Sequence, residues 1–145
     1  MPVLHSAIEP THQLPGVRFT SLATPKLGTQ ETSVWRVEIA PGTLPTAHEV
    51  TREELFIVTA GVARVRLGAE LSQARMGDVV VVPRGVEFEL SAEGTAPLEA
   101  LCCFPVGGQA RLPNGQAFTP PWAEWYRQAA APVGAAVRHG VSYAD

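Results

Sequence analysis

Two stretches of the chain decide its fold: GTLPTAHEVTREELFIVTAG at residues 42–61 and GDVVVVPRGVEF at residues 77–88. Glycines frame the first stretch and recur in the second, and each contains a run of valine, isoleucine or phenylalanine. Glycine suits turns in which the backbone needs a positive φ, whereas β-branched and aromatic residues suit strands. Both stretches therefore predict strands bounded by tight turns.

The neighbouring segments extend this strand pattern. Trp35, Val37 and Ile39 alternate with Arg36 and Glu38, which is the two-residue period of a half-buried strand. Short strands separated by Gly and Pro are typical of an all-β sandwich or barrel. Further strands are predicted at residues 17–22, 55–59, 62–67, 79–82, 86–90 and 98–104.

The segment near residues 120–130 has a different character. Thr119 suits the N-cap of a helix and Pro120 suits its first turn. We expect a short amphipathic helix here, whose aromatic face packs on the outside of the barrel or forms a dimer contact. The residues at helical spacing are Trp122, Trp125, Tyr126 and Ala129.

The length of 145 residues corresponds to one domain. We divide it into an amino-terminal arm with the first strand or strands (residues 1–33), a barrel core (34–105) and a carboxy-terminal extension (106–145). Within the arm, residues 1–16 contain three prolines and are predicted to be irregular.

Charge and cysteine content exclude several classes of protein. A net charge of −3 with scattered arginines argues against a nucleic-acid surface. No apolar run approaches the ~20 residues that a membrane-spanning helix needs, and no leader-like segment opens the chain. Cys102 and Cys103 are adjacent, which suits a disulfide poorly. We expect a cytoplasmic location with reduced thiols and no membrane partner.

The two stretches resemble the signature blocks of the cupin family. The first block of that family has the pattern Gly-x5-His-x-His-x3-Glu-x6-Gly, and the second has Gly-x5-Pro-x-Gly-x2-His. The resemblance covers residues 34–104 and implies a cupin-type double-stranded β-helix, or jelly-roll, barrel. It also implies a homodimer, as in many small relatives. The matching residues are Gly42, His48, Glu54, Gly61, Gly77, Pro83 and Gly85.

The resemblance also implies a divalent metal at the barrel mouth, held in most members by the side chains at positions 48, 50, 54 and 88. This chain has Val50 and Phe88 at two of these positions. A catalytic metal normally needs three or more protein donors. We therefore expect no metal cofactor, and His48 and Glu54 are the ligands that remain. A metal would have to recruit other donors: Glu49, Glu87, Cys102, Cys103, His5 or His12.

His48 and Glu54 are the candidate catalytic residues. An ionised carboxylate in an apolar cavity is costly unless it is paired, and His48 is its obvious partner. Such a pair could act as a general acid or base on a small bound molecule. The alternative is a polar pair solvated at the barrel mouth.

The predicted ligand pocket combines these two residues with apolar ones. A pocket of this kind suits a small, partly hydrophobic ligand with one polar group. The alternative is that Phe88 fills the space of the missing metal and closes the core. Cys102 is included, although the sequence leaves open which of the two adjacent cysteines faces the cavity. The pocket residues are His48, Val50, Glu54, Phe56, Val58, Phe88 and Cys102.

Three functions are consistent with these residues. The first is binding of a small molecule in the barrel. The second is a metal-independent isomerase or epimerase that uses His48 and Glu54. The third is a metal-dependent enzyme of the dioxygenase type.

Overall fold

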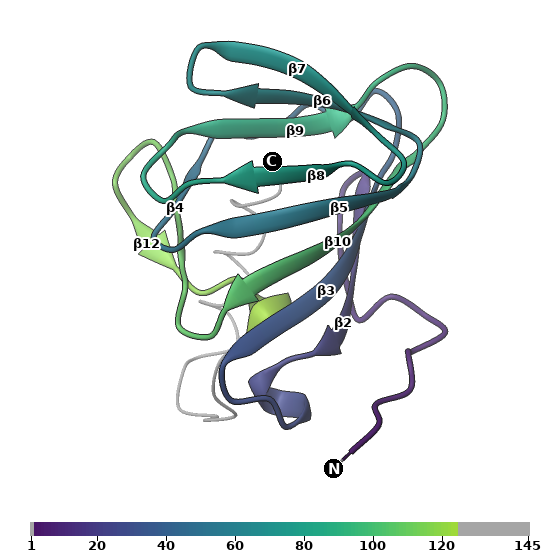
Figure 1. Ribbon diagram of the computed structural model, residues 1–145, viewed down its shortest axis with the longest axis vertical. Coiled ribbons are helices and arrows are strands. Elements are labelled where there is room, and N and C mark those ends of the chain that lie inside the picture. The colour runs from purple at the N-terminus through teal and green to yellow at the C-terminus, as the bar shows by residue number, and fades with distance from the viewer. Residues whose placement is uncertain (1, 125–145) are drawn as a thin grey trace.

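A computed structural model describes residues 2–124, which fold into a barrel of antiparallel strands (Figure 1). Two 3-10 helices, η1 (Pro25–Leu27) and η2 (Pro121–Ala123), accompany the strands, and no helix within residues 2–124 is long and apolar enough to cross a membrane. The strands are β1 (His12–Leu14), β2 (Val17–Ala23), β3 (Thr32–Ile39), β4 (Glu49–Val50), β5 (Glu54–Ala60), β6 (Val62–Leu67), β7 (Glu70–Arg75), β8 (Val79–Val82), β9 (Phe88–Ala92), β10 (Leu98–Pro105), β11 (Ala110–Arg111) and β12 (Ala117–Phe118).

The strands form one large sheet and two small ones. The large sheet has the order β1-β2-β3-β10-β5-β8, and the small sheets have the orders β7-β6-β9 and β12-β11-β4. Strands far apart in the sequence are neighbours, because β10 lies between β3 and β5. These crossovers are those of a jelly roll, so the predicted all-β barrel is confirmed.

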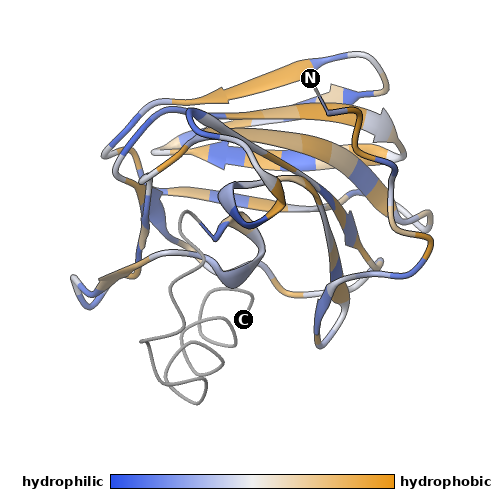
Figure 2. Ribbon diagram, turned by 90° about the horizontal axis from the view of Figure 1, so that it is seen from below, coloured by the Kyte–Doolittle hydropathy of each residue, from blue (hydrophilic) through white to orange (hydrophobic). Residues whose placement is uncertain are grey.

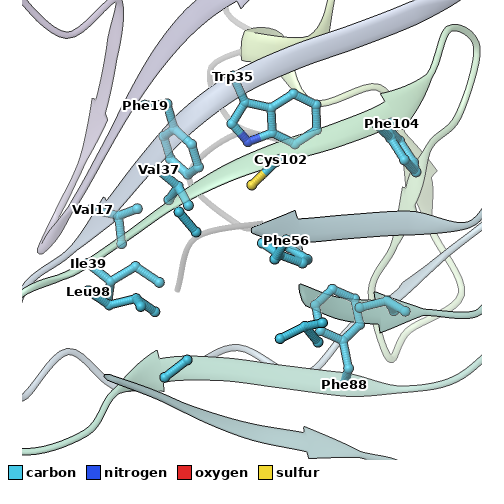
Figure 3. Close-up of a cluster of buried hydrophobic side chains, with 14 of the residues drawn as sticks. Val17, Phe19, Trp35, Val37, Ile39, Phe56, Phe88, Leu98, Cys102 and Phe104 are labelled. Carbon is cyan, nitrogen blue, oxygen red and sulfur yellow. The ribbon is translucent and has the colours of Figure 1, made fainter. Parts of the chain in front are cut away.

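The core follows from the alternation of side chains along each strand. On β10 the pattern of buried and half-buried residues is strictly alternating, and its inward residue Cys102 lies opposite Trp35 of β3 and Phe56 of β5. Figure 3 shows these side chains meeting inside the barrel. In Figure 2 much of the apolar colour lies along the strands. The two-residue period thus predicts which face of each long strand is buried.

Two glycines of the signature stretches hold turns that other residues would strain. Gly61 joins β5 to β6 with φ of 76°, and a Cβ there would collide with the carbonyl oxygen of Pro97. Gly85 has φ of 77°, and its N–H donates to the carbonyl of Val50 at 2.9 Å. The first glycine is required by both backbone conformation and space, whereas the second is required by conformation alone.

The amino-terminal arm is more regular than predicted. His12–Leu14 forms β1, which pairs with β2 across a turn at Pro15 and Gly16. The prediction of an irregular segment over residues 1–16 is therefore wrong for these residues. A strand of three residues carries too short an alternation to be recognised, and its pairing with β2 stabilises it.

The carboxy-terminal segment also differs from its prediction. A 3-10 helix begins at Pro121 with Pro120, rather than Thr119, in the capping position. Trp122 is buried and stacks on the inward-facing Phe19, with ring centroids 3.6 Å apart and planes 6° apart. The expectation that Trp122 packs on the outside of the barrel is therefore wrong, because its ring is buried in the core cluster against Phe19. The rest of the predicted helix, with Trp125, Tyr126 and Ala129, lies outside the described residues.

Candidate functional site

An apolar cavity of about 60 Å³ lies between the large sheet and β9. Strands β2, β3 and β5 supply one wall, β9 supplies the other, and the loop from Thr43 to Thr46 lies at its edge. Figure 3 shows Phe88 of β9 across the interior from Val37 and Ile39 of β3. The lining residues are Val17, Phe19, Trp35, Val37, Ile39, Thr43, Leu44, Pro45, Thr46, His48, Phe56, Phe88 and Leu90.

His48 is held at the cavity by its backbone and its ring. Its N–H donates to the carbonyl of Phe88 at 3.2 Å, and the N–H of Phe88 donates back at 2.8 Å. The ring Nδ1 lies 2.8 Å from the carbonyl oxygen of Thr46. Because a carbonyl oxygen only accepts, Nδ1 carries the proton in the neutral ring and Nε2 is then an acceptor.

The imidazole of His48 is neutral at neutral pH. Burial lowers its pKa to about 4, which outweighs the opposite effects of the Thr46 carbonyl and of the acidic residues Glu87 and Glu89. The ring also lies against Phe88, with centroids 4.3 Å apart. The cavity therefore presents a neutral polar group surrounded by apolar side chains.

Glu54 is fully buried on β5, opposite Val82 of β8. Its Oε1 has no hydrogen-bond partner among the described residues. Burial raises the pKa of this carboxyl to about 8, so the protonated form dominates at neutral pH.

The direct pair between these two residues is not formed. Within the part of the chain that the structure describes, no hydrogen bond or ion pair joins His48 to Glu54, and Glu54 is not among the residues that line the cavity. The two pKa shifts also have separate causes. Glu54 does not contribute to the pKa shift of His48, and His48 does not contribute to that of Glu54. Their joint role as acid and base stays a prediction.

The metal that the family implies does not fit the described residues. Val50 and Phe88, at two of the four ligand positions, are hydrocarbon side chains with exposures of 2% and 1%. Two of the possible replacement donors are engaged elsewhere, because Glu49 lies 3.5 Å from Arg111 and Glu87 lies 3.1 Å from Arg66. Among residues 2–124 no three His, Cys, Asp or Glu side chains come together to hold a metal ion.

The structure gathers only part of the predicted pocket. His48, Phe56 and Phe88 line the cavity. The other four predicted residues are buried in the core beside it rather than along its wall: Val50, Glu54, Val58 and Cys102.

The orientation of the two cysteines is resolved. Cys102 faces the core and is completely buried, whereas Cys103 faces outward and is half-buried. Burial, with the neighbouring Glu54 and Cys103 adding to it, raises the pKa of the Cys102 thiol well above its usual range. An inward thiol of this kind is an unreactive apolar group.

Most of the cavity wall was missed from sequence. The alternation of Trp35, Val37 and Ile39 predicts a buried face, but it does not indicate that this face meets Phe88 across a space. For the loop at the edge, the sequence signal is Leu44, an apolar residue between two predicted strands, and its side chain is 81% exposed.

Fold and cavity together define a class: a small jelly-roll barrel with an apolar cavity between its sheets. Residues 35–104 match the family model of the cupin domain. These residues therefore form a cupin domain, as the two signature stretches predict. No curated protein sequence matches the chain significantly.

Several solved structures share this fold. KdgF from Halomonas sp. is 23% identical, with a TM-score of 0.55 over 63% of this chain and 81% of that protein. A cupin-like protein from Thermotoga maritima is 25% identical, with a TM-score of 0.55 over 60% of this chain and 66% of its own. An oxalate decarboxylase is 21% identical, with a TM-score of 0.59 over 66% of this chain and 27% of its own. These similarities establish the fold rather than an activity.

Proposed function

We propose that the protein binds a small, uncharged and largely apolar molecule in the barrel cavity. The observation that carries this proposal is the composition of the cavity wall. Among the described residues that line it, none is Asp, Glu, Lys or Arg, and its one titratable group, His48, is neutral at neutral pH. A mostly apolar concave site with few polar groups is the usual form of a small-molecule site.

A charged ligand is disfavoured by the same wall. Moving an ion from water into an apolar cavity costs several kcal/mol unless an opposite charge meets it. His48 could supply that charge only below a pH of about 4, where its imidazole is protonated. Alcohols and phenols of low mass, which can donate a hydrogen bond to Nε2 of His48, therefore suit the site better than carboxylic acids or phosphates.

The size of the cavity indicates how a ligand enters. Its volume of about 60 Å³ is well below the ~150 Å³ of a dry engineered cavity that takes up benzene. A ligand with a six-membered ring must therefore displace part of the wall. The movable part is the loop at Leu44 and Pro45, since the remaining wall consists of paired strands.

A matched set of probes tests this proposal. Phenol, cyclohexanol and benzoate have rings of equal size, but only benzoate is charged at pH 7. We expect phenol and cyclohexanol at millimolar concentration to raise the melting temperature, and benzoate to have no effect. His48→Ala should weaken the shift without any turnover of the probe, whereas Glu54→Gln should bind as the wild type does. Equal shifts with all three probes, or none with any, would contradict the proposal.

An acid–base enzyme is the second candidate from the sequence. It requires that His48 and Glu54 reach the same molecule, and Glu54 lies off the cavity wall. Binding is therefore the better supported function. Turnover that is lost in both His48→Ala and Glu54→Gln, with the fold intact, would favour the enzyme instead.

A further inference from the structure

A hollow on the outer surface borders the cavity at the loop that follows β3. It lies between the turn of the β1–β2 hairpin, at residues 15–16, and the first part of this loop, at residues 40–44. Thr43 and Leu44 line both the cavity and the hollow. These two residues therefore stand between the cavity and the solvent. We call residues 40–46 the entrance loop.

The entrance loop rests directly on the backbone of Gly16. The N–H of Ala40 donates to the carbonyl of Gly16 at 2.9 Å, and the hydroxyl of Thr43 donates to the same oxygen at 3.4 Å. Gly16 has φ of 77°, and a Cβ at this position would collide with Oγ1 of Thr43. Every other residue has a Cβ, so Thr43 can take this place only against a glycine.

The far end of the entrance loop is attached to the candidate site. The carbonyl oxygen of Thr46 accepts the N–H of His48 Nδ1 at 2.8 Å. Leu44 and Pro45 lie between the two attachments and belong to no strand or helix. At 3.4 Å the hydrogen bond from Thr43 is long and therefore weak. The attachment of Thr43 to Gly16 is thus the easier one to release.

A second hollow also borders the cavity, beside the ion pair of Arg18 and Glu38, but paired strands close it. The residues that it shares with the cavity wall are Val17 and Ile39. These two residues lie opposite each other on β2 and β3. A passage here would require the two strands to separate and their ladder hydrogen bonds to break. The entrance loop is therefore the part of the wall that moves at lower cost.

We infer that the ligand enters and leaves the cavity past the entrance loop, and that the contact of Thr43 with Gly16 is the latch that holds this loop closed. The inference rests on the proposed binding function and deepens it, because it assigns the route and the residues that set the rate of exchange. None of the described residues that line the outer hollow is Asp, Glu, Lys or Arg. An uncharged ligand therefore meets no ion along this route.

The latch sets how often the cavity opens. Opening requires that Thr43 leave Gly16, whereas Ala40 can stay bonded to Gly16 as the fixed end of the loop. Leu44, which is 81% exposed, then moves away from the cavity with Thr43. A gate of this kind governs the rates of ligand entry and release. The turn of the amino-terminal hairpin thereby controls access to a cavity that residues 15–16 do not line.

A pair of alanine variants tests the latch. Gly16→Ala places a Cβ where Thr43 lies, so it should force the entrance loop open. The matched control is Gly94→Ala, because Gly94 has a similar φ of 84° and nothing lies within 4 Å of its Cβ position. The probe is 4-fluorophenol, which is uncharged at pH 7, and fluorine NMR line shapes measure its exchange with the full chain. Gly16→Ala should exchange the probe at least ~5-fold faster than the wild type, and Gly94→Ala should not.

A reversible cross-link closes the same latch. A Cβ at Gly16 would lie 3.2 Å from the Cβ of Thr43, close to the ~3.5–4.5 Å that a disulfide spans. The double variant Gly16→Cys with Thr43→Cys is treated with oxidised glutathione, and mass spectrometry establishes the cross-link. This form should exchange the probe at least ~10-fold more slowly than the same variant after reduction. The two single variants, treated in the same way, control for oxidation of the half-buried Cys103.

The outcomes separate the latch from the binding function. If the wild type does not bind 4-fluorophenol at millimolar concentration, the binding function fails and the latch falls with it. If the wild type binds the probe, but Gly16→Ala exchanges it no faster than Gly94→Ala or the cross-link does not slow exchange, the latch alone is overturned. Thr43→Ala releases the latch without strain at residue 16 and should also speed exchange, which keeps the test decisive if Gly16→Ala does not fold. Far-UV circular dichroism establishes which variants are folded.

Discussion

Two buried titratable residues, His48 and Glu54, are both held neutral, and burial causes both shifts. The pKa of His48 falls to about 4, and the pKa of Glu54 rises to about 8. An ordinary histidine would titrate near 6.5 and an ordinary glutamic acid near 4.5. Each residue therefore links stability to pH, and the two links have opposite signs.

The signs predict the shape of the stability profile. Between pH 4 and 6.5 the unfolded chain protonates at His48 while the folded chain does not, so this residue makes stability rise with pH. Between pH 4.5 and 8 the unfolded chain ionises at Glu54 while the folded chain does not, so that residue makes stability fall with pH. We expect the free energy of unfolding to be nearly level from pH 4.5 to 6.5 and to fall from 6.5 to 8. Urea unfolding across this range measures it.

Single variants should separate the two contributions. Glu54→Gln removes the contribution that makes stability fall with pH. The free energy of unfolding of this variant should therefore rise from pH 4 to 6.5 and then stay level. His48→Gln removes the contribution that makes stability rise with pH. The free energy of unfolding of this variant should therefore decline from pH 4.5 to 8. The amplitude of each part is on the order of a few kcal/mol. Parallel profiles for the wild type and Glu54→Gln would show that Glu54 is not buried neutral.

Val50 and Phe88 predict how the protein treats metals. Neither side chain has a lone pair, so the purified wild type should contain well under one equivalent of Zn, Fe, Mn or Ni. The double variant Val50→His with Phe88→His restores donors at both positions and should bind a divalent ion measurably by calorimetry. Stoichiometric metal in the wild type, measured by plasma mass spectrometry, would contradict this expectation.

At the scale of elements, the turns of the two signature stretches are not equivalent. Gly61 and Gly85 have almost the same φ, at 76° and 77°. A Cβ at Gly61 meets the backbone of Pro97, whereas a Cβ at Gly85 has nothing within 4 Å. The same substitution at the two sites therefore separates backbone conformation from steric overlap.

Alanine at the two sites should differ in cost. Gly85→Ala places a Cβ in the left-handed region and should destabilise the protein by ~1–2 kcal/mol. Gly61→Ala adds a collision with a backbone that cannot move without disturbing β10, so its cost should exceed that of Gly85→Ala by at least ~1 kcal/mol. Thermal unfolding of both variants measures the difference, and equal costs would mean that the Gly61 turn shifts freely.

How well each element could be predicted depended on its pattern of burial. Strand β3 is half-buried and alternates over eight residues, so its position and its inward face follow from sequence. Strand β7 was missed because only Ala74 of its six residues is buried, which leaves no apolar period. Strands β4, β11 and β12 have two residues each, and their pairing rather than their composition creates them.

For the whole molecule, the last described residues close the barrel next to its second strand. Trp122 is 1% exposed, and it stacks on Phe19, more than one hundred positions earlier in the chain. Phe19 also lines the cavity. Through this stacking, Trp122 supports a residue of the cavity wall.

Trp122→Ala should destabilise the fold by ~3–5 kcal/mol, because it removes a large buried ring. Trp122→Phe keeps a ring against Phe19 and should lose less than half as much. Urea unfolding gives both values. If Trp122→Ala costs under ~1 kcal/mol, the segment is not part of the cooperative fold.

The candidate site could be predicted only in part, for reasons that also lie at this scale. The family resemblance placed His48 and Phe88 together, since the ligand positions of the first and the second block meet at one site. It also placed Glu54 in the same pocket, but its side chain is buried in the core beside the cavity and does not line it. Sequence alternation separates inside from outside, yet it does not indicate where inside the barrel a space remains.

The hydrogen bond between His48 and Thr46 couples the chemistry of the cavity to the position of its entrance. While the loop is closed, the carbonyl of Thr46 keeps the proton on Nδ1, and the ring is an acceptor at Nε2. Under the proposed binding function, a ligand that entered by displacing the loop would break this bond, and either nitrogen of the ring could then carry the proton. A ligand that reaches Nε2 while the Thr46 bond is intact would have to donate a hydrogen bond to it, whereas either tautomer could form once that bond is broken. Discrimination between alcohols and ketones is then made when the loop closes, and it should be expressed in the rate of ligand release rather than in the rate of entry.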